Sequence, residues 1–462
     1  MLRFPTHALF GASLLCAVLA CAAGPASAQI VLGGKQVDDP NAPTPSPAIT
    51  GITAPASNGA LLNLDAPDFQ PLAIAVPAFA ASTDAEKQLA TKIVDLLNKD
   101  LTNSGDFKSL DPATFAAETV DVSVAPAYAN WAGLGAQALV VGKVIINPTG
   151  SVRIQFRVFD TATGKQLVGT EYSMPVAEAW ARLAHKIADD IYEKTTGEAG
   201  YFDSRIVFVA DPGPKAKLGL MDQDGANASL PLTDVPSLQA PRFARSGEFV
   251  VYSADAPNKS GASQLTTGLF TLASGRREQL VIGSPQPNPD ARFSPDGRSI
   301  AYSRNENGNA DLFLLDAAKR TDVQLTKTPG AESGPTFSPD GRYVAFATAS
   351  GVSVARADGQ QATSISTGAY RSPTWSPAGG WIAFEEGGKI GVMKSDGSAK
   401  RLLTQGPSDS SPSWSPNGRV LVFARRDGSS SKLWTIEVSG RNLRELPTAT
   451  NAAQPDWGPK LR

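Results

Sequence analysis

The stretch Pro335-Thr336-Phe337-Ser338-Pro339-Asp340-Gly341-Arg342 decides the fold, because the chain repeats it. Close copies occupy 291–298 and 412–419, and looser copies begin at Pro241, Pro373 and Pro455. The aromatic residues of the copies are separated by 50, 44, 38, 39 and 43 residues, and they are Phe243, Phe293, Phe337, Trp375, Trp414 and Trp457. A repeat of about 40 to 45 residues made of short strands is typical of the blades of a β-propeller.

Each copy predicts a strand, a tight turn and a second strand. The aromatic residue ends the first, inner strand, and the Ser-Pro-Asp-Gly turn follows. Proline presets φ, aspartate accepts local backbone hydrogen bonds, and glycine adopts a positive φ. The second strand, as at 342–347, is apolar on both faces, which is expected where blades stack on both sides. Further strands such as 311–316 and 324–326 bring each unit to four strands.

The two ends of the repeat region complete each other. The segments 205–209 and 218–221 resemble middle strands of a blade, yet no aromatic-Ser-Pro-Asp-Gly turn precedes them. The last copy, at 454–457, is an inner strand with nothing after it. We therefore expect the C-terminal strand to join the blade that begins at Ser204, so that the ring closes and no sheet edge stays open. The sequence predicts a six-bladed β-propeller over 201–462.

The N-terminal residues have the features of an export signal. Arg3, the apolar stretch 8–23 and the Ala26-Ser27-Ala28 cleavage site predict a signal peptide at 1–28. Both cysteines, Cys16 and Cys21, lie inside it, so the mature chain has no thiol for a disulfide or a metal. Lipoprotein processing at Cys21 is the alternative. No later segment of the sequence approaches the ~20 apolar residues of a membrane span, so we expect a soluble exported protein.

Two regions separate the signal from the propeller. The segment 29–66 is rich in Pro, Ala and Gly and predicts a flexible arm, with β-prone pieces at 29–32 and 60–64 that could add a strand to a partner's sheet. Residues 67–200 predict an α/β domain with strands at 71–76, 138–144, 152–158 and 167–174. A helix at 83–104 would be capped by Ser82 and ended by Gly105, and a second helix would place an apolar face over 180–191.

Residues for catalysis or metal binding are scarce in the sequence. The mature chain has one histidine, His185, which we interpret as a partly exposed structural residue. The sequence has no G-x-S-x-G motif, no Gly-rich phosphate loop after a strand and no metal-spaced His/Cys/carboxylate cluster. The stretch Asp222-Gln223-Asp224-Gly225 resembles part of a calcium loop but lacks the later glutamate, so a hairpin turn is the preferred interpretation. We expect no catalytic residue, metal or cofactor.

Polar residues gather just before the inner strands. In a propeller these connections meet around one mouth of the central channel, where they can dock a loop or a small domain of another protein. With 42 basic and 44 acidic residues the chain offers no electrostatic case for binding nucleic acid. The candidate partner-binding residues are Asn288, Asp290, Glu332, Ser333, Arg371, Asp409 and Ser410. We expect Glu332 to be an exposed loop charge, so that Glu332→Arg would weaken binding without unfolding the chain.

The N-terminal domain carries the more specific motifs. They are Leu72-Ala73-Ile74-Ala75-Val76-Pro77-Ala78-Phe79, Trp131-Ala132-Gly133-Leu134-Gly135-Ala136 and Ala184-His185-Lys186-Ile187-Ala188-Asp189-Asp190. In this order, followed by six propeller repeats and covering about 68–459, they resemble the TolB family, the periplasmic propeller proteins of the Tol-Pal system.

The resemblance implies a non-enzymatic scaffold. It implies that the propeller mouth binds the lipoprotein Pal, that the first mature residues bind TolA, and that the two events are coupled to maintain outer-membrane integrity and its invagination during cell division. The TolA-binding candidates are Gln29, Ile30, Val31 and Leu32. The arm is longer than is usual in the family, so 61–64 is an alternative. We expect a monomer. Other hypotheses are a propeller hydrolase or lyase on periplasmic peptides or sugars, and a calcium- or glycan-binding module.

Overall fold

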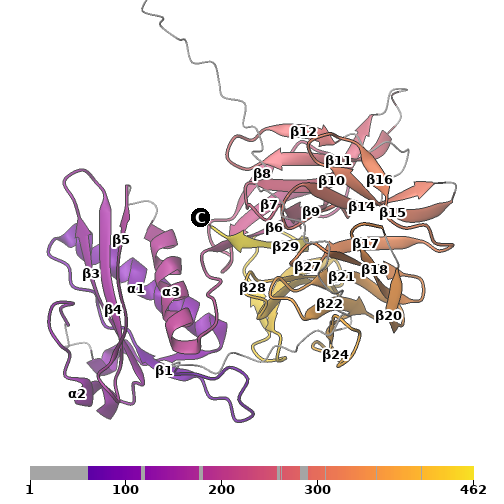
Figure 1. Ribbon diagram of the computed structural model, residues 1–462. Helices are drawn as coiled ribbons and strands as arrows, with labels where there is room; N and C mark the ends of the chain where they lie inside the picture. Colours follow the sequence, from indigo (N-terminus) through magenta and orange to yellow (C-terminus); the bar gives the residue numbers. More distant parts are fainter. Residues whose placement is uncertain are drawn as a thin grey trace, which may run out of the picture. The chain divides into compact units, whose positions relative to one another are not determined.

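The computed structural model describes residues 61–115, 120–175, 180–257, 261, 263–280, 290–306, 308–359, 362–406 and 408–461. All of them belong to one compact unit. An N-terminal α/β domain is followed by a six-bladed β-propeller (Figure 1), which confirms the predicted fold class. The predicted signal peptide and the arm up to residue 60 lie outside the described residues.

The α/β domain has one five-stranded sheet, in the order β2-β1-β3-β4-β5, with α1 and α3 packed against it. Strand β1 is parallel to β2 and β3, whereas β3, β4 and β5 form an antiparallel meander. Its elements are β1 (Leu72–Ala75), α1 (Asp84–Ser104), β2 (Phe107–Ser109), the 3-10 helix η1 (Pro112–Phe115), α2 (Tyr128–Gly133), β3 (Ala138–Ile146), β4 (Val152–Asp160), β5 (Gln166–Met174) and α3 (Trp180–Thr196). The strands and long helices expected here are all present.

Helix α1 is capped by Thr83 and not by Ser82 as predicted. The Thr83 hydroxyl accepts the N–H of Glu86 at 3.2 Å, and the Glu86 carboxylate accepts the N–H of Thr83 at 2.9 Å, which completes a capping box. Hydrogen bonds from the backbone N–H groups of Ile146 and Thr83 lower the pKa of Glu86 to about 2. The helix ends, as predicted, at Gly105, whose φ of 79° is easily reached by glycine.

The end of the predicted arm is part of the core. Leu62 and Leu64 are only 8% and 4% exposed and pack with the residues of the α/β domain. The N–H groups of Leu61 and Leu62 both donate to the Thr195 carbonyl, at 2.8 and 2.9 Å. The expectation of a flexible arm as far as residue 66 is therefore wrong for 61–66, because two leucines in this short stretch find apolar surface to cover.

The propeller consists of six four-stranded antiparallel sheets (Figure 1). From inner to outer strand they are β29-β6-β7-β8, β9-β10-β11-β12, β13-β14-β15-β16, β17-β18-β19-β20, β21-β22-β23-β24 and β25-β26-β27-β28. The first sheet joins the C-terminal strand to the strand that begins at Ser204, with Trp457 opposite Ile206. Six blades and closure by the C-terminal strand are thus confirmed.

The strand bounds in the propeller are β6 (Ser204–Ala210), β7 (Lys217–Asp222), β8 (Ser229–Leu232), β9 (Gln239–Phe243), β10 (Phe249–Pro257), β11 (Ser263–Thr271), β12 (Arg277–Leu280), β13 (Arg292–Phe293), β14 (Ser299–Glu306), β15 (Asn309–Asp316), β16 (Asp322–Gln324), β17 (Glu332–Phe337), β18 (Tyr343–Thr348), β19 (Gly351–Arg356), β20 (Thr363–Thr367), β21 (Tyr370–Trp375), β22 (Trp381–Glu386), β23 (Lys389–Lys394), β24 (Arg401–Leu402), β25 (Asp409–Trp414), β26 (Val420–Asp427), β27 (Ser430–Glu437), β28 (Arg444–Leu446) and β29 (Ala452–Lys460).

The Ser-Pro-Asp-Gly turn is held by its own side chains. In the turn between β17 and β18, the N–H of Gly341 donates to the Ser338 carbonyl at 2.9 Å, and Gly341 has a φ of 72°. The Ser338 hydroxyl donates to Asp340 at 2.5 Å and accepts the N–H of Tyr343 at 3.0 Å. The serine, the aspartate and the glycine of the motif therefore each satisfy one requirement of the tight turn.

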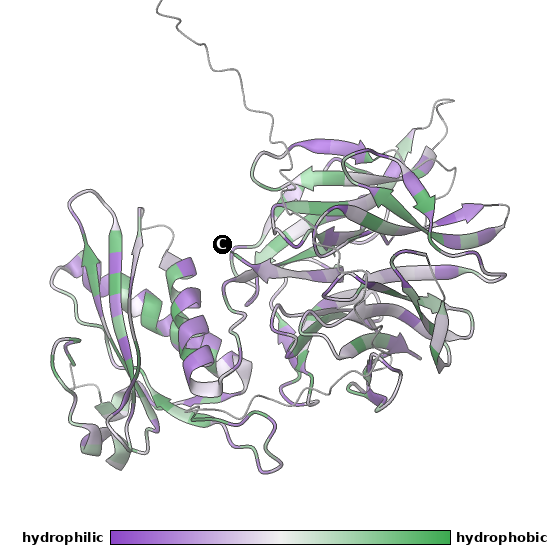
Figure 2. Cartoon of the chain, in the orientation of Figure 1, coloured by the Kyte–Doolittle hydropathy of each residue, from purple (hydrophilic) through white to green (hydrophobic). Residues whose placement is uncertain are grey.

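Blades stack through strands that are apolar on both faces. In β18, Val344 and Phe346 pack with the preceding blade, whereas Ala345 packs with Ile382 and other residues of the following blade. Figure 2 shows the contrast between such apolar middle strands and a polar outer strand such as β12. Within the part of the chain that the structure describes, no helix has both the length and the apolar character needed to cross a membrane.

Candidate functional site: the two mouths of the propeller channel

The innermost strands of the blades, which we call the inner strands, share one irregularity. Five of them contain a residue with positive φ followed by proline: Ala240 (47°), Gly334 (61°), Ser372 (47°), Ser411 (54°) and Gln454 (49°). Each coincides with a break in register against the second strand. Four of these residues are not glycine, and a non-glycine residue in this conformation costs about 1–3 kcal/mol, so strain recurs at one level of the channel.

The central channel has two open ends, or mouths, one at each end of the inner strands. We call the end where the inner strands begin the start mouth, and the end with the Ser-Pro-Asp-Gly turns the turn mouth. At the start mouth Ser333 and Arg371 are exposed and Ser410 is half-buried. Each of the three directly precedes the left-handed residue of its strand, so they occupy one register position on consecutive blades. The structure therefore gathers three of the candidate residues in equivalent places.

Two candidate residues, Glu332 and Asp409, are buried, and for Glu332 this corrects the expectation of an exposed loop charge. Glu332 is 1% exposed; its carboxylate accepts the hydroxyls of Thr326 and of Thr328, the latter at 2.8 Å. Burial raises its pKa above the ordinary value, although these hydroxyl donors act in the opposite direction. Asp409 is fully buried and accepts a two-pronged ion pair from Arg425 at 2.6 and 2.8 Å. Glu332 therefore links the start of β17 to the segment after β16, and Asp409 links β25 to β26.

The remaining candidates divide between the described and undescribed parts of the chain. Asp290 is half-buried and accepts Arg242 Nη2 at 3.0 Å. Asn288 lies outside the described residues, as do Gln29, Ile30, Val31 and Leu32. Exposed Arg371 faces Glu385 across the β21–β22 pair, and burial raises the pKa of Glu385.

Polar side chains from one repeat position form a ring that was not predicted from the sequence, and all of them except Arg242 line the cavity at the turn mouth. Its members directly precede the six repeat aromatics: Arg242, Arg292, Thr336, Thr374, Ser413 and Asp456. Several link neighbouring blades. Thr336 Oγ1 accepts the N–H of Trp375 at 3.1 Å, and Asp456 Oδ2 accepts the N–H of Phe243 at 2.8 Å. The signal that could have revealed the ring is a polar residue before each aromatic.

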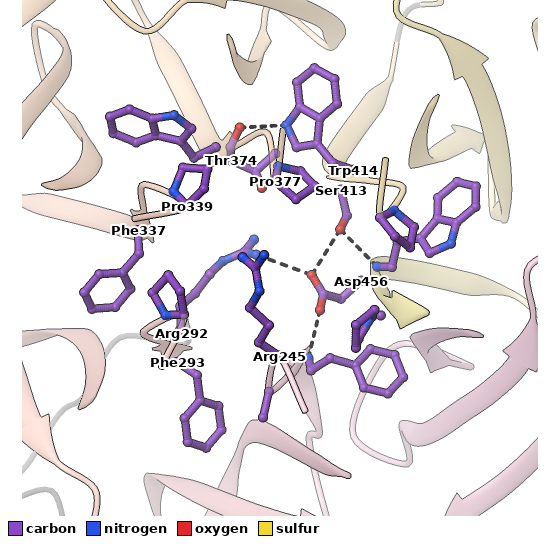
Figure 3. A pocket seen from close by; sticks show the side chains of 18 of the residues that line it. Arg245, Arg292, Phe293, Phe337, Pro339, Thr374, Pro377, Ser413, Trp414 and Asp456 are labelled. Carbon is purple, nitrogen blue, oxygen red and sulfur yellow. Dashed lines mark hydrogen bonds and ion pairs between the residues drawn. The ribbon is translucent and has the colours of Figure 1, made fainter. Parts of the chain in front are cut away.

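The turn mouth contains a cavity of about 510 Å³. Figure 3 shows ring residues around this cavity together with prolines, which we call the collar, and repeat aromatics, and those labelled are Arg292, Thr374, Ser413, Asp456, Pro339, Pro377, Phe293, Phe337 and Trp414. The aromatics are buried or half-buried and join the blade clusters, as expected for core residues. The collar includes Pro295, Pro339, Pro377, Pro416 and Pro459, with Arg245 in the sixth position. Arg292 donates to Asp456 at 3.3 Å within this cavity.

His185 lies away from both mouths. It is 2% exposed, which corrects the expectation of partial exposure, and its Nδ1 lies 2.6 Å from Asp100 Oδ2. Burial lowers the pKa of His185, but the hydrogen bond and the charge of Asp100 outweigh it and raise that pKa to about 9. Asp100 also accepts Gln223 Nε2 at 2.9 Å, which links α1 to the turn after β7. The histidine therefore acts as a buried cross-link.

The Asp222–Gly225 segment is the hairpin turn between β7 and β8. Gly225 has a φ of 87°, and Asp224 accepts Lys99 Nζ at 2.8 Å. Asp222 accepts Asn227 Nδ2 at 2.6 Å. Among the described residues, no group of three or more His, Cys, Asp or Glu side chains could hold a metal ion.

A small α/β domain joined to a six-bladed propeller with a polar channel defines the class of this protein. Residues 61–167 match the TolB amino-terminal domain, and residues 192–461 match the TolB beta propeller domain. The Tol-Pal system protein TolB of Gluconobacter oxydans (strain 621H) is 36% identical over 475 residues, covering 90% of this chain and 92% of that protein. The chain belongs to the TolB family.

A solved structure has the same fold. TolB from Acinetobacter baumannii superposes with a TM-score of 0.73 at 23% identity, covering 85% of this chain and 97% of that one. At this identity the likeness concerns the fold. Membership of the family rests on the two domain matches and on the relative from Gluconobacter oxydans.

Proposed function

We propose that this chain is a periplasmic, non-enzymatic docking protein of the Tol-Pal system. It binds the lipoprotein Pal at the start mouth and TolA through residues 29–32, and thereby contributes to outer-membrane integrity and to invagination during cell division. The observation that carries the Pal part is the arrangement of Ser333, Arg371 and Ser410, one on each of three consecutive blades at the same register position.

The physical basis is preorganisation. The left-handed residues and the prolines after them fix the backbone just below these side chains, as at Ser372-Pro373. A rigid surface loses less conformational entropy on binding than a mobile one, so more of the contact energy appears as affinity. An exposed arginine among small hydroxyl residues is also the composition of a protein-docking centre, because arginine is enriched among the residues that dominate binding.

Arg371→Glu tests the Pal-docking surface. We expect at least about a tenfold loss of affinity for Pal, measured by calorimetry or surface plasmon resonance, because the charge at a central contact is reversed. The matched control is Arg342→Glu, an equally large charge change at the exposed turn mouth, which should leave the affinity unchanged. Equal affinities of the two variants for Pal would remove Arg371 from the docking site.

Deletion of residues 29–37 tests the TolA-binding segment. We expect TolA binding to be abolished and Pal binding to be retained, because the start mouth is intact. Deletion of 40–48 removes the same number of residues from the same arm and should spare both. Retained TolA binding without 29–37 would move the site to 61–64, whose leucines are packed in the core and would first have to be released.

A further inference from the structure

The turn mouth departs from its own repeat at one residue. Five blades place proline in the second position of the turn, whereas the blade of β9 places Arg245 there. The turn itself is unchanged: the N–H of Gly247 donates to the Ala244 carbonyl at 2.9 Å, as Gly341 does to Ser338. The backbone at this position therefore does not require arginine, and the side chain is available for another role.

Arg245 brings a charge that the described residues do not neutralise. It is exposed, lines the cavity and has no ion pair with the part of the chain that the structure describes. Figure 3 shows the side chains of Arg245 and Arg292 both reaching into the middle of the cavity. A guanidinium that projects into a concave site without a counter-ion favours an anionic ligand.

Two further arginines near Arg245, Arg292 and Arg242, are only partly paired. Arg292 donates to Asp456 Oδ1 at 3.3 Å, but the same carboxylate also accepts the Ser413 hydroxyl at 3.1 Å and the Phe243 N–H at 2.8 Å. The nearby Arg242 is paired with Asp290, yet its Nε is buried with no hydrogen-bond partner among the described residues. Burial and then the charge of Arg242 lower the pKa of Arg292, whereas the charges of Asp456 and Asp290 act in the opposite direction.

We propose that the turn-mouth cavity binds a carboxylate, held by Arg245 from the rim and by Arg292 from the channel ring. Carboxylates match the planar fork of a guanidinium, and the collar of prolines and aromatics suits an apolar stem behind the charged group. A volume of about 510 Å³ accommodates a small organic acid or the last residues of a peptide. This site lies at the opposite end of the inner strands from the Pal-docking surface and goes beyond the proposed function.

Calorimetry on the mature chain with three probes tests the site. The probes are succinate, the tripeptide acetyl-Ala-Leu-Ala with a free C-terminal carboxylate, and the same tripeptide as an amide. We expect the peptide acid to bind at least about tenfold more tightly than the amide, because the amide lacks the charge for the guanidinium groups. Binding of succinate as well would indicate a free acid as ligand, and binding of the peptide acid alone would indicate a chain terminus.

Arg245→Pro restores the repeat residue and removes the charge, so it should weaken binding of the acid at least about tenfold. Arg245→Gln gives a second variant if the proline disturbs the turn, and Arg342→Gln removes a charge from another turn without affecting binding. Pal affinity should be the same in all variants. No binding of any probe at 10 mM or below, equal binding of acid and amide, or wild-type affinity in both Arg245 variants would overturn the proposal.

Discussion

Glu332 and Ser333 are neighbours in sequence with opposite environments, and this difference can be measured. Glu332 is buried and bound by two threonine hydroxyls, whereas Ser333 is exposed. Glu332→Ala should lower the free energy of unfolding by about 1–3 kcal/mol, because buried hydroxyls lose their acceptor. Ser333→Arg should change it by less than about 0.5 kcal/mol. Urea denaturation checks both, and equal effects would contradict the burial of Glu332.

The burial of Glu332 could not be predicted from the sequence, for a physical reason. Strand residues alternate between faces only while the register holds. The register breaks between Ser333 and Thr336, at the left-handed Gly334, so the residues before and after the break do not follow one alternation. The burial of His185 could not be predicted for another reason: its partner Asp100 is 85 residues away, and helix periodicity does not indicate such a contact. The turns and the aromatics were predicted correctly because they are local.

At the scale of elements, strand β29 closes the propeller ring by pairing with β6. The Trp457 side chain is 6% exposed, and its indole N–H donates to the Ser204 hydroxyl at 2.8 Å. Trp457→Ala should therefore cost about 3–5 kcal/mol of unfolding free energy. The matched control is Trp375→Ala, which removes the equivalent but half-buried aromatic of β21 and should cost less. Urea unfolding measures both, and a larger loss for Trp375→Ala would argue against the importance of the closure.

The number of blades and the pairing of β29 with β6 were predictable because both follow from repeat spacing and from the need to satisfy sheet edges. The packing of 61–66 was not, because the three leucines of this stretch have packing partners that lie elsewhere in the sequence. The channel ring was also missed, although its members occupy one repeat position. Each is an ordinary polar residue in the sequence, and five of the six line one cavity only because the inner strands surround a common axis.

At the scale of the whole molecule, polar side chains of the α/β domain bond to the propeller. Gln223 donates to Asp100, Lys99 pairs with Asp224, and Lys460 pairs with Asp189 at 2.9 Å. These contacts include buried ionisable groups, so the stability of the molecule should depend on pH. Two buried groups have strongly shifted pKa values: His185, and Asp106, whose pKa is raised by burial to about 7.

The pair of His185 and Asp100 predicts a loss of stability in mildly alkaline solution. The pKa of His185 is about 9 in the folded chain against an ordinary 6.5, so the folded state holds the proton more tightly. Its contribution is complete below pH 6.5 and is lost as pH rises through about 9, on the order of 3 kcal/mol in total.

His185→Gln should flatten this part of the pH profile, measured as the urea-unfolding free energy between pH 6 and 9.5. The glutamine amide can still donate to Asp100 but does not titrate, so the comparison tests the proton on His185. Burial also raises the pKa of Asp100, and the charge of His185 opposes this rise in the wild type only. The ionisation of Asp106 also lowers the free energy of unfolding as pH rises, because burial raises its pKa in the folded chain. This fall lies mainly below pH 7 and is the same in the wild type and in His185→Gln. A profile for His185→Gln that falls as steeply between pH 7 and 9.5 as the wild-type profile would show that this histidine is neutral in the folded chain.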